Sequence, residues 1–518
     1  MKILKNIIIC LTTISACSCS LYPESTYKSK TRTNYNFPEL NDKSCSFNSL
    51  TGKSYKKDLN NKECKERVFY STTDYSKTIA VLEIDEQGRF VDEEHINRIL
   101  EFIKNREKPI VSLYIHGWNH NSRISDSDLH AFQTVVNNLH DDWKETESDE
   151  NKKQIKRDSV GIYIAWRGRV FPKWANYVTF WNRKSVSISV GRSDLTRFIL
   201  QLEQNVKARS QNKNGTLILM GHSFGASALY NAISPTLITR FYDSLTEQQT
   251  NPDVPLKGVG DLVVLMNPAI EAKQFVALRE AVWQEGVKNN NIFKNNPRPI
   301  FMMFGSNSDG SLNNAFPTGR YLNTVWFNKY TNTTIVDGNS LCNNKPCLTE
   351  NGINKPLLLS VQESKMDRRA IGNYEWFYTH WLAFDQEPKL PKQKLFSNND
   401  FQISSYPTNK CQIEKNWLEK AYKNDNHQWV ALPSRNTKND LMKISTQFIP
   451  IDGKYEWRKT GIHRRPEPQK ATGSRSDGTT WNYNPYWFIR TNGSVIPGHN
   501  GIWKAGVGCF ILSTLKFD

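Results

Sequence analysis

Residues 216–225 read TLILMGHSFG, an apolar run that leads into the pentapeptide around Ser223. The small and apolar residues 226–233 follow it and predict a helix. A strand that turns into a helix through Gly-x-Ser-x-Gly is typical of a nucleophile elbow, where a strained turn exposes the serine hydroxyl. The alternative is an ordinary strand-to-helix turn capped by Ser223. The flanking strand and helix favour the elbow.

Short apolar runs recur on both sides of this turn and predict strands. They cover residues 109–115, 160–166, 261–266, 299–304 and 486–490. Apolar residues at helical spacing predict helices over 129–139 and 195–206. Strands that alternate with helices indicate an α/β fold with a mostly parallel sheet covered by helices.

With these motifs the chain resembles the α/β-hydrolase superfamily, over about residues 75 to 325 and about the last thirty residues. The family places nucleophile, acid and histidine in that chain order. The resemblance implies that Ser223 is the nucleophile. It also implies an oxyanion hole built from two backbone N–H groups, those of Phe224 and Trp118, the latter in the loop after the third strand. His116, in that loop, and His222, in the elbow, are implied to be structural.

The acid of such a site belongs just after the seventh strand, where Asp309 stands within residues 305–310. Its carboxylate would accept the second ring proton of the histidine and fix the tautomer. A polar turn is the alternative interpretation of this segment, since Asn, Ser, Asp and Gly also favour turns. Glu271, after the sixth strand, is the alternative acid.

Two histidines compete for the role of the base. His499 follows a strand and a glycine-containing loop and precedes an apolar segment at 507–512, which predicts a closing helix. His380 lies among aromatic residues, a setting more typical of packing or of a pocket wall. We therefore expect His499 to be the base and keep His380 as the alternative.

The interval between Asp309 and His499 is about 190 residues, much longer than in a minimal member of the family. We expect residues 325–480 to be an insertion within a hydrolase domain that spans 66–518. Inserts in this superfamily commonly form lids, so a cap over the site is one interpretation. A side domain packed away from the site is the other.

The first residues resemble a bacterial lipoprotein signal. Lysines precede a short apolar region, which ends in Ile-Ser-Ala before Cys17. On that resemblance residues 1–16 are removed and Cys17 receives fatty acyl chains such as palmitate. Two or more chains are needed for durable anchoring. Ser18 then favours the outer membrane. A plain secretory signal is the alternative.

Residues 17–65 are polar with little periodicity, and we expect a flexible tether there. Export would permit disulfides, and Cys45 with Cys64 and Cys342 with Cys347 are candidate pairs. No cysteine has the spacing of a metal site. We expect neither a metal nor a cofactor.

The formal charge of +17 raises the question of nucleic acid as a partner. Basic residues are scattered, without the aromatic-interleaved stripe that marks such binding, so we expect none. Attraction to anionic lipid or polysaccharide, or a simple compositional bias, are the remaining interpretations.

Together these features predict a membrane-anchored serine hydrolase that cleaves carboxylic esters, lipids among them, through an acyl-enzyme. The alternative is a catalytically silent fold that serves as an envelope scaffold or a ligand-binding lipoprotein. The sequence leaves the acyl group, the alcohol and the oligomeric state open.

Overall fold

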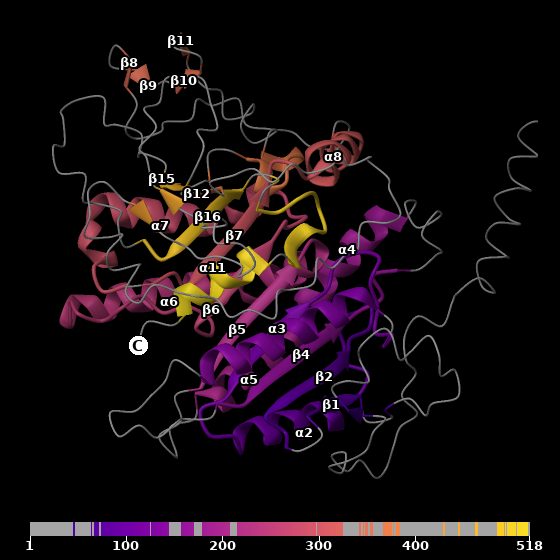
Figure 1. The fold of residues 1–518 in the computed structure, drawn as a ribbon. Coiled ribbons are helices and arrows are strands. Elements are labelled where there is room, and N and C mark those ends of the chain that lie inside the picture. The colour runs from indigo at the N-terminus through magenta and orange to yellow at the C-terminus, as the bar shows by residue number, and fades with distance from the viewer. Residues whose placement is uncertain are drawn as a thin grey trace, which may run out of the picture.

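One ten-stranded sheet organises the chain, as the ribbon of the computed structural model displays (Figure 1). The structure describes, apart from a few single residues, 45–46, 64, 67–71, 74–124, 126–144, 157–169, 179–207, 215–296, 298–324, 366–374, 380–383, 484–491, 495–503 and 505–515, with short pieces between 341 and 355 and between 428 and 464. In spatial order the strands are β1 (Val68–Tyr70), β2 (Lys77–Glu83), β4 (Ser159–Ala165), β3 (Ile110–Ile115), β5 (Thr216–His222), β6 (Leu262–Met266), β7 (Phe301–Ser306), β16 (Tyr486–Thr491), β12 (His380–Ala383) and β15 (Gly461–Arg464).

Eight of these strands, from β2 to β12, run parallel, and the two edge strands β1 and β15 are antiparallel to their neighbours. The α/β class and the mostly parallel sheet are therefore confirmed. Parallel strands all end at the same edge, so the segments that follow β3, β5, β6, β7 and β16 meet there. Ligand sites of open α/β sheets lie beyond such carboxyl ends.

Helices cover both faces of the sheet. One hydrophobic cluster joins the sheet to α2 (Glu93–Lys104), α4 (Phe180–Gly191), α5 (Asp194–Val206), α6 (Phe224–Thr250) and α7 (Val276–Lys288). The other joins it to α3 (Ser127–Lys144) and α11 (Ala505–Leu515). Along β5, Leu219 belongs to the first cluster and Ile218 and Met220 to the second. Both faces of the strand are buried, which explains its unbroken apolar run.

Parts of the long interval before His499 belong to the sheet or pack beside it. Strands β12 and β15 extend the sheet beyond β16. The segment 366–374 lies along the loop after β6, where Ile371 N–H donates to Ile270 O at 2.9 Å. Gly305 and Gly372 touch backbone to backbone, since a Cβ on Gly305 would lie 2.5 Å from Gly372 Cα. These pieces brace the carboxyl edge of the sheet.

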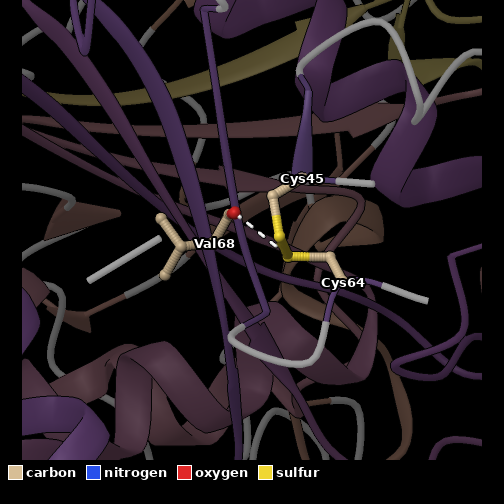
Figure 2. The surroundings of a disulfide bond; sticks show 3 residues. All are labelled: Cys45, Cys64 and Val68. Atoms are coloured by element: carbon tan, nitrogen blue, oxygen red, sulfur yellow. Dashed lines mark hydrogen bonds between the residues drawn. A yellow bond between two sulfur atoms is a disulfide. The ribbon is translucent and has the colours of Figure 1, made fainter. Parts of the chain in front are cut away.

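A disulfide joins Cys45 to Cys64, one of the two pairs that the sequence suggests. Figure 2 shows this bond next to Val68 of β1, with Cys64 Sγ 3.3 Å from the Val68 carbonyl oxygen. Both cysteines are buried in the second hydrophobic cluster. Parts of the segment 17–65 therefore pack against the domain. Cys347 lies outside the described residues.

The remaining described elements are short, and several follow β7. They are η5 (Ala272–Phe275), η6 (Asn290–Phe293), η7 (Ser311–Ala315), α8 (Phe316–Thr324), η8 (Ile371–Asn373), η10 (Gly501–Trp503), β8 (Leu341–Cys342), β9 (Lys345–Pro346), β10 (Leu348–Glu350), β11 (Ile353–Lys355), β13 (Gln428–Trp429) and β14 (Ile444–Ser445). Among the described residues, none of the helices has the length and hydropathy to cross a bilayer.

Candidate active site

Ser223 stands between the end of β5 and the first residue of α6, at a strained turn. Its φ of 54° and ψ of −117° lie outside the regions that L-residues favour. Glycines on both sides make the turn possible. A Cβ on Gly225 would lie 2.1 Å from the Ile115 carbonyl oxygen, and one on Gly221 would lie 2.7 Å from Ala226 Cα. The Gly-x-Ser-x-Gly spacing thus follows from the close approach of α6 to β3 and β5.

The structure brings Ser223, His499 and Asp309 into one hydrogen-bonded chain. His499 Nε2 lies 2.7 Å from Ser223 Oγ, and His499 Nδ1 lies 2.6 Å from Asp309 Oδ2. Asp309 is fully buried beyond the end of β7, and its Oδ1 accepts the N–H of Leu312 at 3.0 Å. A hydroxyl, an imidazole and a carboxylate in this order can move a proton off the serine oxygen.

The loop after β3 lies directly against the turn that carries Ser223. A Cβ on Gly117 would lie 3.1 Å from Ser223 Cβ. Trp118 is the next residue, and Asn119 after it adopts a positive φ of 74°. On the other side, the Phe224 N–H occupies the first position of α6, where no acceptor exists within the helix. Of the two residues that the sequence assigns to an oxyanion hole, Phe224 thus follows the serine directly, and Trp118 follows the glycine that packs against it.

His116 uses both ring nitrogens to shape this loop. Its Nδ1 lies 2.8 Å from the Gly117 carbonyl oxygen, and its Nε2 accepts the N–H of Trp166 at 3.2 Å. The Trp166 indole N–H in turn donates to the His116 carbonyl oxygen at 2.9 Å. Burial lowers the pKa of His116 to about 4, so the ring is neutral at pH 7. Through these contacts His116 holds the loop after β3 against the end of β4.

The alternative acid, Glu271, forms ion pairs with two basic side chains, whereas His499 pairs with Asp309. Glu271 is buried, and its Oε1 pairs with Lys184 Nζ at 2.6 Å and with Arg320 Nε at 3.0 Å. His380 opens β12, where its backbone pairs in register with Ile489 of β16. Its side chain is not among the parts that the structure describes.

Aromatic rings gather on the Trp118 side of the serine. The Phe180 ring packs against Trp118 at a centroid distance of 5.3 Å and against Phe224 at 4.9 Å. Trp181 continues the row to Phe316, at 6.2 Å. Trp118, Phe180 and Trp181 are only partly buried. We call these five residues the aromatic row.

Asn267 is a neighbour of the site that the sequence does not single out. It follows β6 directly, is fully buried and has a positive φ of 42°. A polar residue immediately after an apolar run is the signal that marks it. That signal is weak, because polar residues end most strands.

Among the residues that the structure describes, no group of three or more His, Cys, Asp or Glu side chains is arranged to hold a metal ion.

Comparison with known proteins adds no relative: no family model, no curated protein and no solved structure matches this chain.

Proposed function

We propose that this protein is a serine hydrolase with the α/β-hydrolase fold that cleaves carboxylic esters. The observation that carries the proposal is the chain of hydrogen bonds from Ser223 Oγ through His499 to the buried Asp309. Two further features support it. The serine occupies a strained strand-to-helix turn, and the nucleophile, acid and histidine follow in the family's chain order.

The first half of the reaction transfers the acyl group to the serine. His499 Nε2 takes the Ser223 hydroxyl proton while Oγ attacks the ester carbonyl carbon. The tetrahedral intermediate collapses, its bond to the alcohol oxygen breaks, and His499 returns the proton to the departing alcohol. Asp309 stabilises the imidazolium through the hydrogen bond at Nδ1. Water then attacks the acyl-enzyme by the same route and releases the acid.

Charge on the carbonyl oxygen is stabilised by backbone N–H groups of Phe224 and Trp118. The Phe224 N–H lies at a helix N-terminus, where the helix dipole favours negative charge. Gly117 allows the Trp118 loop to approach the serine closely. Loss of one such donor typically raises a barrier by about 2.7–4 kcal/mol.

The aromatic row supports an apolar acyl group as the substrate class. Trp118 carries a proposed oxyanion donor on its backbone, and its partly exposed side chain continues into Phe180 and Trp181. An acyl chain bound at Ser223 on this side meets aromatic surface, and its burial contributes roughly 0.8 kcal/mol per CH₂ group. Esters of fatty acids, lipids included, fit this surface.

A fluorophosphonate probe tests the proposed function, because it phosphonylates a serine only when a neighbouring base and oxyanion hole activate it. We expect the folded wild-type protein to take up one probe per chain, and peptide mass mapping to place the adduct on Ser223. Heat-denatured protein is the control and should remain unlabelled. A folded protein that stays unlabelled, or an adduct on another serine, would contradict the proposal.

We also propose that the enzyme is anchored to the bacterial outer membrane through lipid on Cys17. This part depends on the sequence of the first residues, which lie outside the part of the chain that the structure describes. We expect cells to incorporate labelled palmitate into the wild-type protein and not into Cys17→Ser, because the thiol is the acylation site. Cys19→Ser is the matched control. Equal labelling of Cys17→Ser and wild type would refute the anchor.

A further inference from the structure

His499 lies on a loop, and the loop needs contacts from elsewhere to hold the ring in place. Strand β16 ends at Thr491 and η10 begins at Gly501, so no regular secondary structure fixes residue 499. A base held by a loop is useful only when its ring is kept in place. A displacement of about 1 Å can cost a hundredfold in rate.

Two side chains converge on the main-chain carbonyl oxygen of His499. Asn267 Nδ2 donates to it at 2.9 Å, and His222 Nε2 lies 3.0 Å from it. Asn267 Nδ2 also reaches the Gly498 carbonyl oxygen at 3.2 Å. A carbonyl oxygen can accept two hydrogen bonds, and the His499 carbonyl oxygen accepts one from Asn267 and one from His222.

Asn267 links three segments of the carboxyl edge. Its Oδ1 accepts the N–H of Ser306 at 3.0 Å, at the end of the strand that leads to Asp309. Its own N–H donates to the Phe304 carbonyl oxygen at 2.8 Å. Asparagine tolerates the left-handed backbone that this position requires. One buried amide thus joins the end of β6, the acid strand and the histidine loop.

We propose that Asn267 and His222 are positioning residues, which fix the backbone of His499 so that its ring reaches Ser223 and Asp309 together. The inference depends on the proposed function for its catalytic meaning. Neither side chain needs to touch the substrate, since both act on the carbonyl group of residue 499.

The protonation state of His222 suits this role. Burial, with the nearby charge of His499, lowers the pKa of His222 to about 3. A neutral imidazole has one N–H, and donation to the His499 carbonyl places it on Nε2. His222 therefore remains a hydrogen-bond donor and adds no positive charge when His499 gains a proton during the reaction.

Other hydrogen bonds also hold the loop, so loss of the Asn267 amide should shift His499 without releasing the loop. Ser306 Oγ donates to the Ile496 carbonyl oxygen at 2.6 Å. Ser308 Oγ accepts the N–H of Gly498 at 3.0 Å. These two bonds are upstream of His499 and do not involve Asn267.

Asn267→Gly tests the proposal, because glycine keeps the positive φ and removes the amide. We expect kcat for a 4-nitrophenyl ester to fall about a hundredfold with KM unchanged. Asn296→Gly is the matched control. Asn296 is another buried asparagine, which accepts the N–H of Leu256 at 3.0 Å, but it precedes β7 at the opposite edge of the sheet. It should lower stability with little effect on kcat.

A second pair of variants keeps the test valid if Asn267→Gly does not fold. His222→Leu removes the donor, whereas His222→Gln can restore an N–H to the same carbonyl oxygen. We expect the glutamine variant to recover most of the activity that the leucine variant loses. Full activity in Asn267→Gly, or equal activity in the two His222 variants, would overturn the proposal.

Proton NMR separates this proposal from the proposed function. The low-field resonance of the His499 Nδ1–H, hydrogen-bonded to Asp309, reports ring placement without turnover. We expect it in the wild type and expect it shifted or broadened in Asn267→Gly. A wild-type protein that neither hydrolyses the ester nor reacts with the fluorophosphonate would contradict the proposed function but not the positioning of His499. An unchanged resonance in Asn267→Gly would defeat the positioning role.

Discussion

If the proposed function holds, Ser223→Ala lowers kcat for ester hydrolysis on the order of 10⁶-fold, the loss that removal of the triad serine causes in a well-studied serine protease. In the proposed reaction the hydroxyl oxygen forms the acyl-enzyme, and His499 Nε2 lies 2.7 Å from it. Without that oxygen neither the acyl-enzyme nor the fluorophosphonate adduct can form. Initial rates with a 4-nitrophenyl ester, and probe labelling on a gel, measure both losses.

Two further variants make this result specific to the hydroxyl. Ser223 has a positive φ, so alanine there is strained, and Ser223→Gly removes the oxygen without that strain. Ser227→Ala is the matched control, since Ser227 is a buried serine one helical turn further along α6. It should keep wild-type rates. Residual activity within about tenfold of wild type in Ser223→Gly would exclude Ser223 as the nucleophile.

His499→Ala is expected to cause a loss of similar size, again on the order of 10⁶-fold in kcat, because serine and histidine act as a unit. The ring connects Ser223 to Asp309, with both nitrogens engaged. No other histidine is hydrogen-bonded to Ser223 within the described part of the chain. Single-turnover measurements of acyl-enzyme formation should show that the loss falls on the acylation step.

His380→Ala is the control, because His380 is the other histidine that the sequence offers as a base. It is the first residue of β12 and pairs in register with Ile489 of β16, whereas His499 lies in the loop that follows β16. We expect it to retain wild-type probe labelling. Loss of labelling in His380→Ala, with labelling retained in His499→Ala, would reverse the assignment.

The sheet and the elbow could be predicted from the sequence because their signals are local. The run at 160–166 lies within one residue of β4, and the run at 216–220 covers most of β5. The helix after the elbow is longer than its apolar signal: α6 extends to Thr250 and contains Pro235. Proline removes one helical hydrogen bond, but the packing of the flanking turns keeps the helix continuous.

The sequence ranks the candidates for the acid and the base, but it does not exclude the lower-ranked residue in either case. Asp309 and Glu271 both follow strands at the same edge, and only long-range contacts separate them. Glu271 is held by Lys184 and Arg320, which come from α4 and α8. The residues next to Glu271 in the sequence do not indicate that basic side chains from distant helices pack against it.

The proposed positioning contacts could not be predicted from the sequence either, because they also join residues that are far apart in the chain. Asn267 and His499 are separated by 232 residues and His222 and His499 by 277, and the shared atom is a main-chain oxygen. No side-chain pattern reports which carbonyl group will lie within reach. The strands β12 and β15 could not be predicted either, because each is only four residues long.

The Cys45–Cys64 disulfide marks where the chain joins the domain, and this position limits how far Ser223 could lie from the proposed anchor at Cys17. Twenty-eight residues separate Cys17 from Cys45, so a chain anchored at Cys17 could place the domain at most about 100 Å from the anchor. On the proposed anchoring, that length sets the radius within which Ser223 could reach membrane-associated substrate.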